Sequence, residues 1–234
     1  MNSLSIAYED EYMIICHKPA GMAVQTRSLT ATDLESEVCN YLYKKGKGKN
    51  PYVGIINRLD QPVEGLVLFA KDSDTAGRLS KIMQSEESSK YYMAVVEGKP
   101  GEAETLINYL VKDGKSGSAR VCLESDLGAK KAVLEYEKLE EICLEKRTLS
   151  LLKIHLITGR FHQIRIQLSN AGYPIVGDKK YNAKSLFGGE LYKYPALVSC
   201  ELDFFHPYSG ENLDICIRPW NKIFDNFHIS FDEC

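Results

Sequence analysis

Residues 55–71 read IINRLDQPVEGLVLFAK, and they give the strongest indication of how this chain folds. Two apolar runs rich in β-branched residues flank a short polar loop that contains an arginine, an aspartate, a proline and a glycine. This pattern predicts a strand, a loop and a second strand. Asp60 is then held on a loop between two buried strands, in the fixed position that a nucleophile needs. A structural turn is the alternative, because aspartate side chains accept hydrogen bonds from nearby backbone N–H groups.

Other stretches accompany this loop in a fixed order, and each is a weak motif by itself. They are the segment 8–21, KYYMAVVEG at 90–98, TGRFHQIRIQL at 158–168, GYPIVGD at 172–178 with Tyr181, and Phe205-His206-Pro207 with Pro219. With the Asp60 loop, the ordered set resembles the RluA-type pseudouridine synthases from about residue 5 to about residue 220. Taken together, the set is highly specific.

The resemblance implies the pseudouridine synthase fold, an α+β fold with a mixed, mostly antiparallel, bent sheet, flanking helices and a central catalytic cleft. It also implies a single catalytic domain over residues 1–234, with no room before Ile6 for the N-terminal RNA-binding module of many relatives. Many strands joined by short loops lead to the same α+β class. The expected strands are 4–8, 12–17, 52–57, 66–71, 90–97, 103–110, 118–123, 131–142, 147–157, 197–205 and 212–218.

Apolar spacing and capping residues predict the helices. Thr32-Asp33-Leu34-Glu35 has the form of a capping box, which predicts a helix near 33–45. Ser73 is the expected cap of a second helix, with Ala76, Leu79 and Ile82 on one face. The third helix is expected to present Phe161, Ile164, Leu168 and Ala171 on one face, and a short helix near 220–227 completes the set.

Three residues are the candidate catalytic groups. By resemblance, Asp60 is the nucleophile or base, and we expect Arg165 to pair with it, since a nearby cation keeps a carboxylate ionised. Tyr92 is expected to pack against an extruded uracil. The alternatives are a surface salt bridge for Arg165 and an ordinary core position for Tyr92.

Four further residues are the candidate RNA contacts. The resemblance suggests that Arg58 enters the RNA stack or holds a phosphate. Arg160, His162 and Gln163 stand at the start of a predicted helix, where free N–H groups favour phosphate. His162 also suits a hydrogen-bonded structural role. No metal-ligand set and no phosphate-binding glycine loop occurs, so we expect no cofactor.

Composition is that of an ordinary globular protein, with 44% hydrophobic and 26% charged residues. No apolar run has the length of a bilayer crossing, and the N-terminus lacks a signal-peptide pattern, so we expect no membrane partner and a cytoplasmic protein. The seven cysteines form no Cys-x-x-Cys pair, which indicates reduced thiols and no zinc site. The net charge of −3 disfavours phosphate binding by the chain as a whole, but clustered lysines can still form a positive groove.

The expected activity is isomerisation of specific uridines in structured RNA, ribosomal or transfer RNA, with DNA not expected as a partner and a monomer as the expected state. The sequence departs from the family pattern at Asn57, at Val63 and Glu64, and at Gln167, and we expect Glu64 to narrow the choice of RNA. One competing hypothesis is a glycoside hydrolase that uses Asp60 and Glu64 as a carboxylate pair. Another is a non-catalytic RNA-binding or RNA-folding protein.

Overall fold

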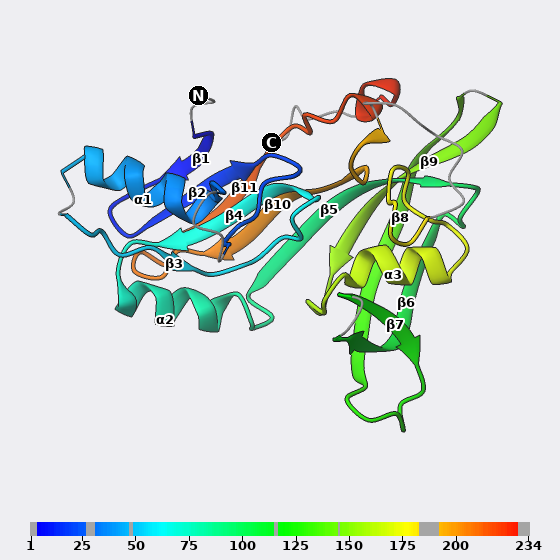
Figure 1. The fold of residues 1–234 in the computed structure, drawn as a ribbon, viewed down its shortest axis with the longest axis horizontal. Helices are drawn as coiled ribbons and strands as arrows, with labels where there is room; N and C mark the ends of the chain where they lie inside the picture. The colour runs from blue at the N-terminus through cyan, green and yellow to red at the C-terminus, as the bar shows by residue number, and fades with distance from the viewer. Residues whose placement is uncertain are drawn as a thin grey trace. The chain divides into compact units, whose positions relative to one another are not determined.

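The computed structural model describes residues 4–26, 31–46, 49–114, 117–144, 146–182 and 192–228. The chain divides into two units of dense internal contact. Unit 1 runs to Ser89 and includes Ser199–Trp220, and unit 2 contains Lys90–Val198 and the segment that starts at Asn221. Both units contain mostly antiparallel strands and at least one α-helix (Figure 1), which confirms the α+β class. The single domain over 1–234 stays a prediction.

Unit 1 has the strand order β1-β2-β4-β10-β11, and the short β3 also pairs with β4. The bounds are β1 Ile6–Glu9, β2 Met13–Lys18, β3 Gly54–Ile55, β4 Glu64–Ala70, β10 Leu197–Phe205 and β11 Asn212–Cys216. Every residue of β2 and of β4 is buried, as expected for strands covered on both faces. Gly65 is required where β4 approaches Ser199, because its φ is 134° and a Cβ there would lie 2.5 Å from the Ser199 backbone.

Two α-helices belong to unit 1, α1 at Leu34–Lys44 and α2 at Ser73–Ile82. Both predicted helices are confirmed, but each begins with an aspartate cap one residue away from the predicted cap. Asp33 accepts a hydrogen bond from Ser36 N, and Asp72 accepts one from Thr75 N. The main core cluster contains alternate residues of three strands and the end of α2: Met13, Ile15, Leu66, Leu68, Ala70, Leu79, Met83, Leu202 and Phe204.

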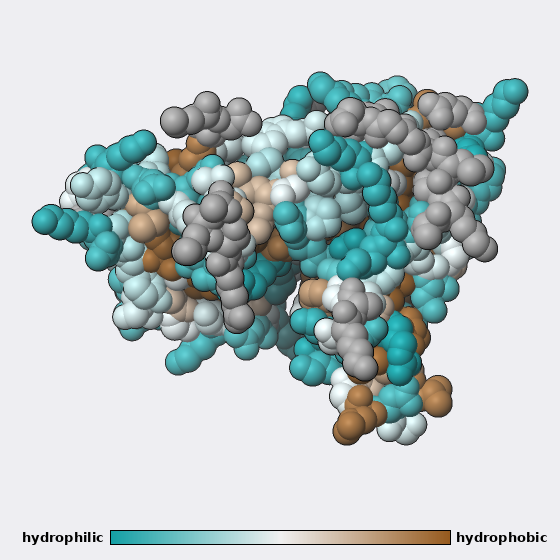
Figure 2. Space-filling view, viewed as in Figure 1, coloured by the Kyte–Doolittle hydropathy of each residue, from teal (hydrophilic) through white to brown (hydrophobic). Residues whose placement is uncertain are grey.

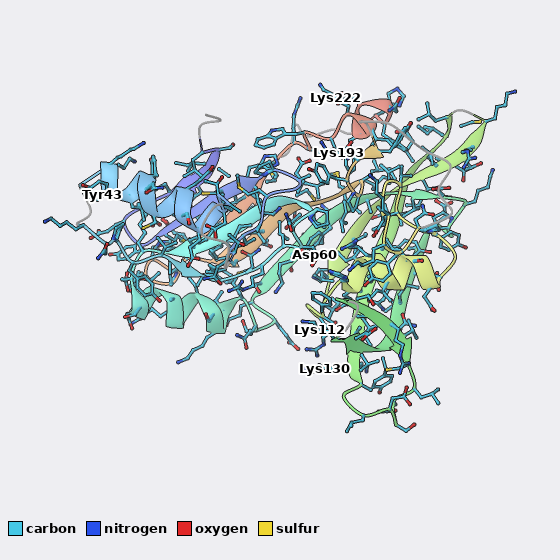
Figure 3. The ribbon with its side chains drawn as sticks, in the orientation of Figure 1. Tyr43, Asp60, Lys112, Lys130, Lys193 and Lys222 are labelled. Atoms are coloured by element: carbon cyan, nitrogen blue, oxygen red, sulfur yellow. The ribbon has the colours of Figure 1, made fainter. Side chains whose placement is uncertain are left out.

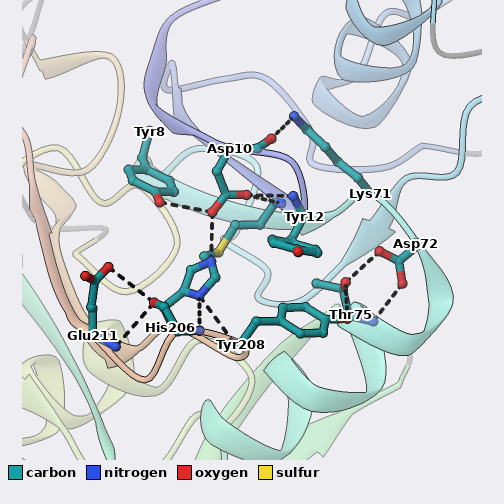
Figure 4. A network of polar contacts seen from close by, with 11 residues as sticks. Tyr8, Asp10, Tyr12, Lys71, Asp72, Thr75, His206, Tyr208 and Glu211 are labelled. Atoms are coloured by element: carbon teal, nitrogen blue, oxygen red, sulfur yellow. Dashed lines mark hydrogen bonds and ion pairs between the residues drawn. The ribbon is translucent and has the colours of Figure 1, made fainter.

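A polar network around Asp10 connects the β1–β2 turn to the segment after β10 (Figure 4). Asp10 accepts hydrogen bonds from the backbone N–H groups of Tyr12 and Met13 at 2.7 and 2.8 Å. His206 Nε2 lies 2.9 Å from the same carboxylate, while its Nδ1 accepts from the backbone of Ser209. Burial raises the pKa of Asp10, but these hydrogen bonds outweigh it and leave that pKa below its usual value.

Unit 2 has the strand order β5-β9-β8-β6-β7, with every pairing antiparallel. The bounds are β5 Ser88–Glu97, β6 Ala103–Asp113, β7 Ser118–Cys122, β8 Lys130–Leu144, β9 Arg147–Leu156, helix α3 Gln163–Asn170 and the 3-10 helix η2 Lys222–Asn226. Helix α3 packs on β6 and β7 through a small cluster of Leu110, Ala119, Ala132 and Ile166 (Figure 1). Apolar side chains at the β7–β8 connection stay exposed, among them Leu123 and Leu127 (Figure 2).

Two of the predicted elements differ in extent for a local reason that the structure shows. The strand expected at 52–57 has only two residues, because the Asn57 side chain takes over the pairing with β4. The helix expected from Phe161 begins at Gln163, because His162 has the left-handed φ of 54° and interrupts the helical path. No helix in the described ranges is long and apolar enough to cross a bilayer.

Candidate active site

The Asp60 turn belongs to unit 1 and lies between β3 and β4. Val63 N donates to Asp60 O at 3.0 Å and closes the turn. On its other side, Asn57 Nδ2 donates to Leu66 O at 3.1 Å, and Asn57 Oδ1 accepts from Leu68 N at 2.7 Å. The departure at Asn57 is therefore structural: its amide replaces backbone pairing and fixes the segment that enters the turn.

Lys18 lies beneath this turn and is fully buried. Its Nζ donates to three backbone carbonyls, Pro19 O at 3.0 Å, Met22 O at 2.8 Å and Gln61 O at 3.2 Å. Burial lowers the pKa of Lys18 to about 8, and the nearby negative charge of Asp60 acts in the opposite direction. Lys18 therefore connects the opening hairpin to the residue that follows Asp60. The sequence places Lys18 in the opening motif but gives no sign of these contacts.

Glu64 is buried rather than presented to solvent. Its Oε1 lies 2.9 Å from His17 Nε2 and accepts from Trp220 N at 2.5 Å. The Trp220 ring stacks on His17 with centroids 3.7 Å apart. The Glu64 carboxylate is therefore held inside unit 1, and the expectation that it narrows the choice of RNA stays a prediction. The same contacts weaken the idea of a glycosidase pair with Asp60.

Arg58 and Tyr92 occupy different settings. Arg58 is exposed in unit 1, and its Nη2 donates to Gln25 Oε1 at 2.7 Å. Tyr92 lies in β5 of unit 2 and is 7% exposed. Its neighbour Tyr91 points to the other face of the strand, where its ring stacks on His155 with centroids 4.9 Å apart. Tyr91 therefore has ring partners of its own on the face opposite Tyr92.

Arg165 is held in one orientation inside unit 2. Its Nε and Nη2 donate to the two carboxylate oxygens of Asp178 at 2.7 and 2.8 Å, and the two side chains are 5% and 1% exposed. Asp178 Oδ1 also accepts from Lys180 N and Tyr181 N. The guanidinium lies 5.1 Å from the centre of the Tyr181 ring. The GYPIVGD motif contains Asp178, but the sequence does not reveal that Asp178 orients Arg165. The Arg165–Asp60 pairing stays a prediction.

The other predicted contacts lie in the connection from β9 to α3 and at the first residue of α3. Gln163 is buried, and its amide accepts from Thr158 Oγ1 and Arg160 N and donates to Val133 O. Gln163 therefore builds the connection from β9 to α3. His162 Nδ1 lies 2.7 Å from the Tyr181 hydroxyl. Arg160 is exposed, and its Nε donates to Lys131 O at 2.9 Å.

No cluster of histidine, cysteine or acidic side chains in the described ranges could hold a metal ion. The cysteines described there are free thiols. Asp60 and Arg58 belong to unit 1, whereas Tyr92, Arg160, His162, Gln163 and Arg165 belong to unit 2. Each unit thus supplies part of the predicted set of functional residues, on a turn in unit 1 and on β5 and α3 in unit 2.

Comparison with known proteins gives consistent matches. A family profile described as RNA pseudouridylate synthase matches residues 12–170. The chain is 27% identical to ribosomal large subunit pseudouridine synthase D of Zymomonas mobilis, over 90% of the chain and 68% of that protein. It is 28% identical to tRNA pseudouridine synthase C of Vibrio vulnificus, over 96% of the chain and 95% of that protein. The solved structure of human RNA Pseudouridylate Synthase Domain Containing 1 has the same fold, with a TM-score of 0.73, 21% identity, and coverage of 98% of this chain and 92% of that one.

Proposed function

The chain belongs to the RNA pseudouridylate synthase family and is an RNA pseudouridine synthase, and from this premise we propose that Asp60, Tyr92 and Arg165 carry the reaction. The reaction breaks the bond between uracil N1 and the ribose C1′ and forms one between C5 and C1′. A proton leaves C5 and a proton is gained at N1, so the atoms of the nucleotide balance. The chemistry requires a positioned acid–base or nucleophilic group, which Asp60 supplies.

The observation that carries this proposal is the anchoring of the Asp60 turn. Lys18 holds the carbonyl of the residue after Asp60, and Asn57 fixes the chain before it. A carboxylate on so constrained a turn keeps its position when a nucleotide arrives, which is how preorganised groups lower a barrier. Arg165, fixed by Asp178, supplies an oriented cation, and Tyr92 supplies a ring for the extruded base.

The substrate we propose is structured RNA, either ribosomal or transfer RNA, since the relatives named above act on one or the other. Arg58 and Arg160 are exposed cations suited to its phosphates. For Gln163 the proposed contribution is indirect, through the shape of the β9–α3 connection. The monomeric state and the cytoplasmic location stay predictions, to be tested by light scattering and by microscopy.

The test is a map of pseudouridine in ribosomal and transfer RNA from cells that lack the gene. The cells are complemented with the wild type, with Asp60→Ala, or with Asp74→Asn as a matched change at an exposed carboxylate of unit 1. We expect particular sites to lose pseudouridine and to regain it with the wild type and Asp74→Asn only. Recovery of those sites by Asp60→Ala would contradict the role of Asp60 and favour a non-catalytic protein.

A further inference from the structure

One face of unit 2 combines an exposed aromatic ring with several cations. In the β6–β8 register Leu110 pairs with Lys130, and side chains alternate along each strand, so Leu110, Lys112 and Lys130 lie on the same face of the sheet. Leu110 is buried there beneath α3. Lys112 and Lys130 are exposed at the edge of this packed region, and Figure 3 shows them on the same flank of the unit.

Phe161 lies at the same edge, just before α3. The left-handed backbone of His162 keeps Phe161 out of the helix, and the Phe161 side chain is 39% exposed. Its ring stacks on the His162 ring with centroids 3.8 Å apart, and Lys112 Nζ lies 4.4 Å from its centre. We call Lys112, Lys130, Arg160 and Phe161 the Phe161 rim.

The charged side chains of the Phe161 rim are all positive. Within the described ranges, no aspartate or glutamate forms an ion pair with Lys112, Lys130 or Arg160. At the opposite end of the same strands, Lys99 pairs with Glu141 at 2.7 Å and Lys138 pairs with Glu102 at 2.8 Å. The Phe161 rim thus gathers three cations around an exposed ring in a chain whose net charge is −3.

We propose that the Phe161 rim binds an unpaired nucleotide of the RNA substrate, with its base stacked on Phe161 and its phosphates neutralised by Lys112, Lys130 and Arg160. Aromatic rings that accept bases, set among cations that follow the backbone, are how proteins bind single-stranded nucleic acid. Lys112 is a flexible exposed side chain, so its ammonium moves from the ring to the phosphate when the base arrives. The inference rests on the proposed function, because the occupant is the RNA that the enzyme modifies.

The experiment measures binding of two fluorescent probes, a short oligouridylate and an abasic ribose-phosphate chain of the same length. Phe161→Ala should weaken binding of the oligouridylate about tenfold, since one base–aromatic stack is lost. Binding of the abasic chain should stay unchanged. Lys112→Ala should weaken both probes and lower the salt dependence of binding by about one ion. Lys222→Ala, which removes an exposed lysine paired with Asp225, is the matched control.

Two more substitutions separate stacking from folding. Phe161→Tyr keeps a ring and should bind like the wild type, whereas Phe161→Leu keeps apolar bulk without a ring and should bind like Phe161→Ala. Equal binding by the wild type and Phe161→Leu would overturn the proposal, as would equal losses for the two probes in Phe161→Ala.

A separate assay keeps this proposal distinct from the proposed function. The wild type is tested for pseudouridine formation in transcribed transfer and ribosomal RNA. If the wild type forms pseudouridine but substitution of Phe161 does not change binding, only the proposal for the Phe161 rim is contradicted. If binding of the oligouridylate depends on Phe161 but the wild type forms no pseudouridine in either RNA, only the proposed function is contradicted.

Discussion

Unit 1 and unit 2 each bury a cation beside a predicted catalytic segment, but they hold it with different partners. Lys18 of unit 1 donates to three neutral backbone carbonyls, and burial lowers its pKa to about 8. Arg165 of unit 2 faces a carboxylate, Asp178, that matches two of its N–H groups. The ammonium donates hydrogen bonds to three carbonyls of a loop, whereas two N–H groups of the guanidinium match one planar carboxylate. Lys18 therefore fixes the backbone of a turn, whereas Asp178 fixes the orientation of the Arg165 side chain itself.

This contrast predicts the largest loss of stability in unit 2. Asp178→Ala removes the carboxylate that accepts two hydrogen bonds from the buried Arg165, which should lower the free energy of unfolding by about 3–5 kcal/mol. Asp225→Ala removes a carboxylate from an exposed pair with Lys222 and should cost less than about 1 kcal/mol. Urea unfolding of the two variants measures both values. Equal effects would mean that the Arg165–Asp178 pair does not stabilise unit 2.

A smaller loss is expected at Lys18. Lys18→Met removes the donor of three hydrogen bonds but also removes the cost of burying a charge, so the net loss at neutral pH should be about 2 kcal/mol. Pseudouridine formation should fall as well, because the Asp60 turn loses its anchor at Gln61. Leaving both stability and activity unchanged would contradict the anchoring role.

The same variant tests the pKa of Lys18. The folded protein releases this proton near pH 8, whereas the unfolded chain keeps it until about pH 10.5, the ordinary value for lysine. The contribution of Lys18 to stability should therefore rise as pH increases between these two values. The difference in free energy of unfolding between the wild type and Lys18→Met, measured at several pH values, gives the contribution of Lys18. Parallel curves for the two proteins would show that the Lys18 pKa is not lowered.

The sequence predicts the elements of both units well, since alternation and helical spacing are local signals. It places the helix caps one residue from their true positions because Thr32 and Ser73 are acceptable caps beside Asp33 and Asp72. It assigns Phe161 to a helix face because the spacing to Ile164 suits a helix. Spacing carries no information on the left-handed residue between them.

The candidate site is predicted less completely. The sequence identifies Asp60, Tyr92 and Arg165 by their motifs. A motif does not reveal which distant residues contact them in the folded chain. Lys18 and the carbonyl of Gln61 are 43 residues apart, and only the pairing of β2 with β4 brings them together. Glu64 falls in the predicted loop, and only the structure shows that it begins β4 and contacts His17.

Unlike Lys18, Lys71 of unit 1 donates to a carboxylate, that of Glu9. Glu9 accepts from Lys71 and Tyr41 at 2.8 and 2.7 Å. Burial raises the pKa of Glu9, but these partners and Lys45 outweigh it and lower the pKa to about 2. Glu9→Gln should cost about 1 kcal/mol at neutral pH. Since the folded-state pKa is depressed, this stabilisation should disappear as pH falls from about 4.5 to about 2.

Acid unfolding of Glu9→Gln and the wild type measures this effect. Glu11→Gln, a change at an exposed neighbour, serves as the control and should follow the wild type at every pH. If Glu9→Gln remains less stable than the wild type by the same amount at about pH 2, the variant has lost packing rather than a charge interaction.

The smallest effect on activity is expected at Glu64, whose charge acts on Lys18 together with that of Asp60. Glu64→Gln keeps an oxygen that accepts from Trp220 N, so unit 1 should lose less than about 1 kcal/mol of stability. The rate of pseudouridine formation should change by less than about threefold, because the carboxylate is buried against His17. Single-turnover kinetics of Glu64→Gln and of Asp60→Ala, each compared with the wild type, measure this effect. A loss as deep as that of Asp60→Ala would place Glu64 in the chemistry, as the hypothesis of a carboxylate pair requires.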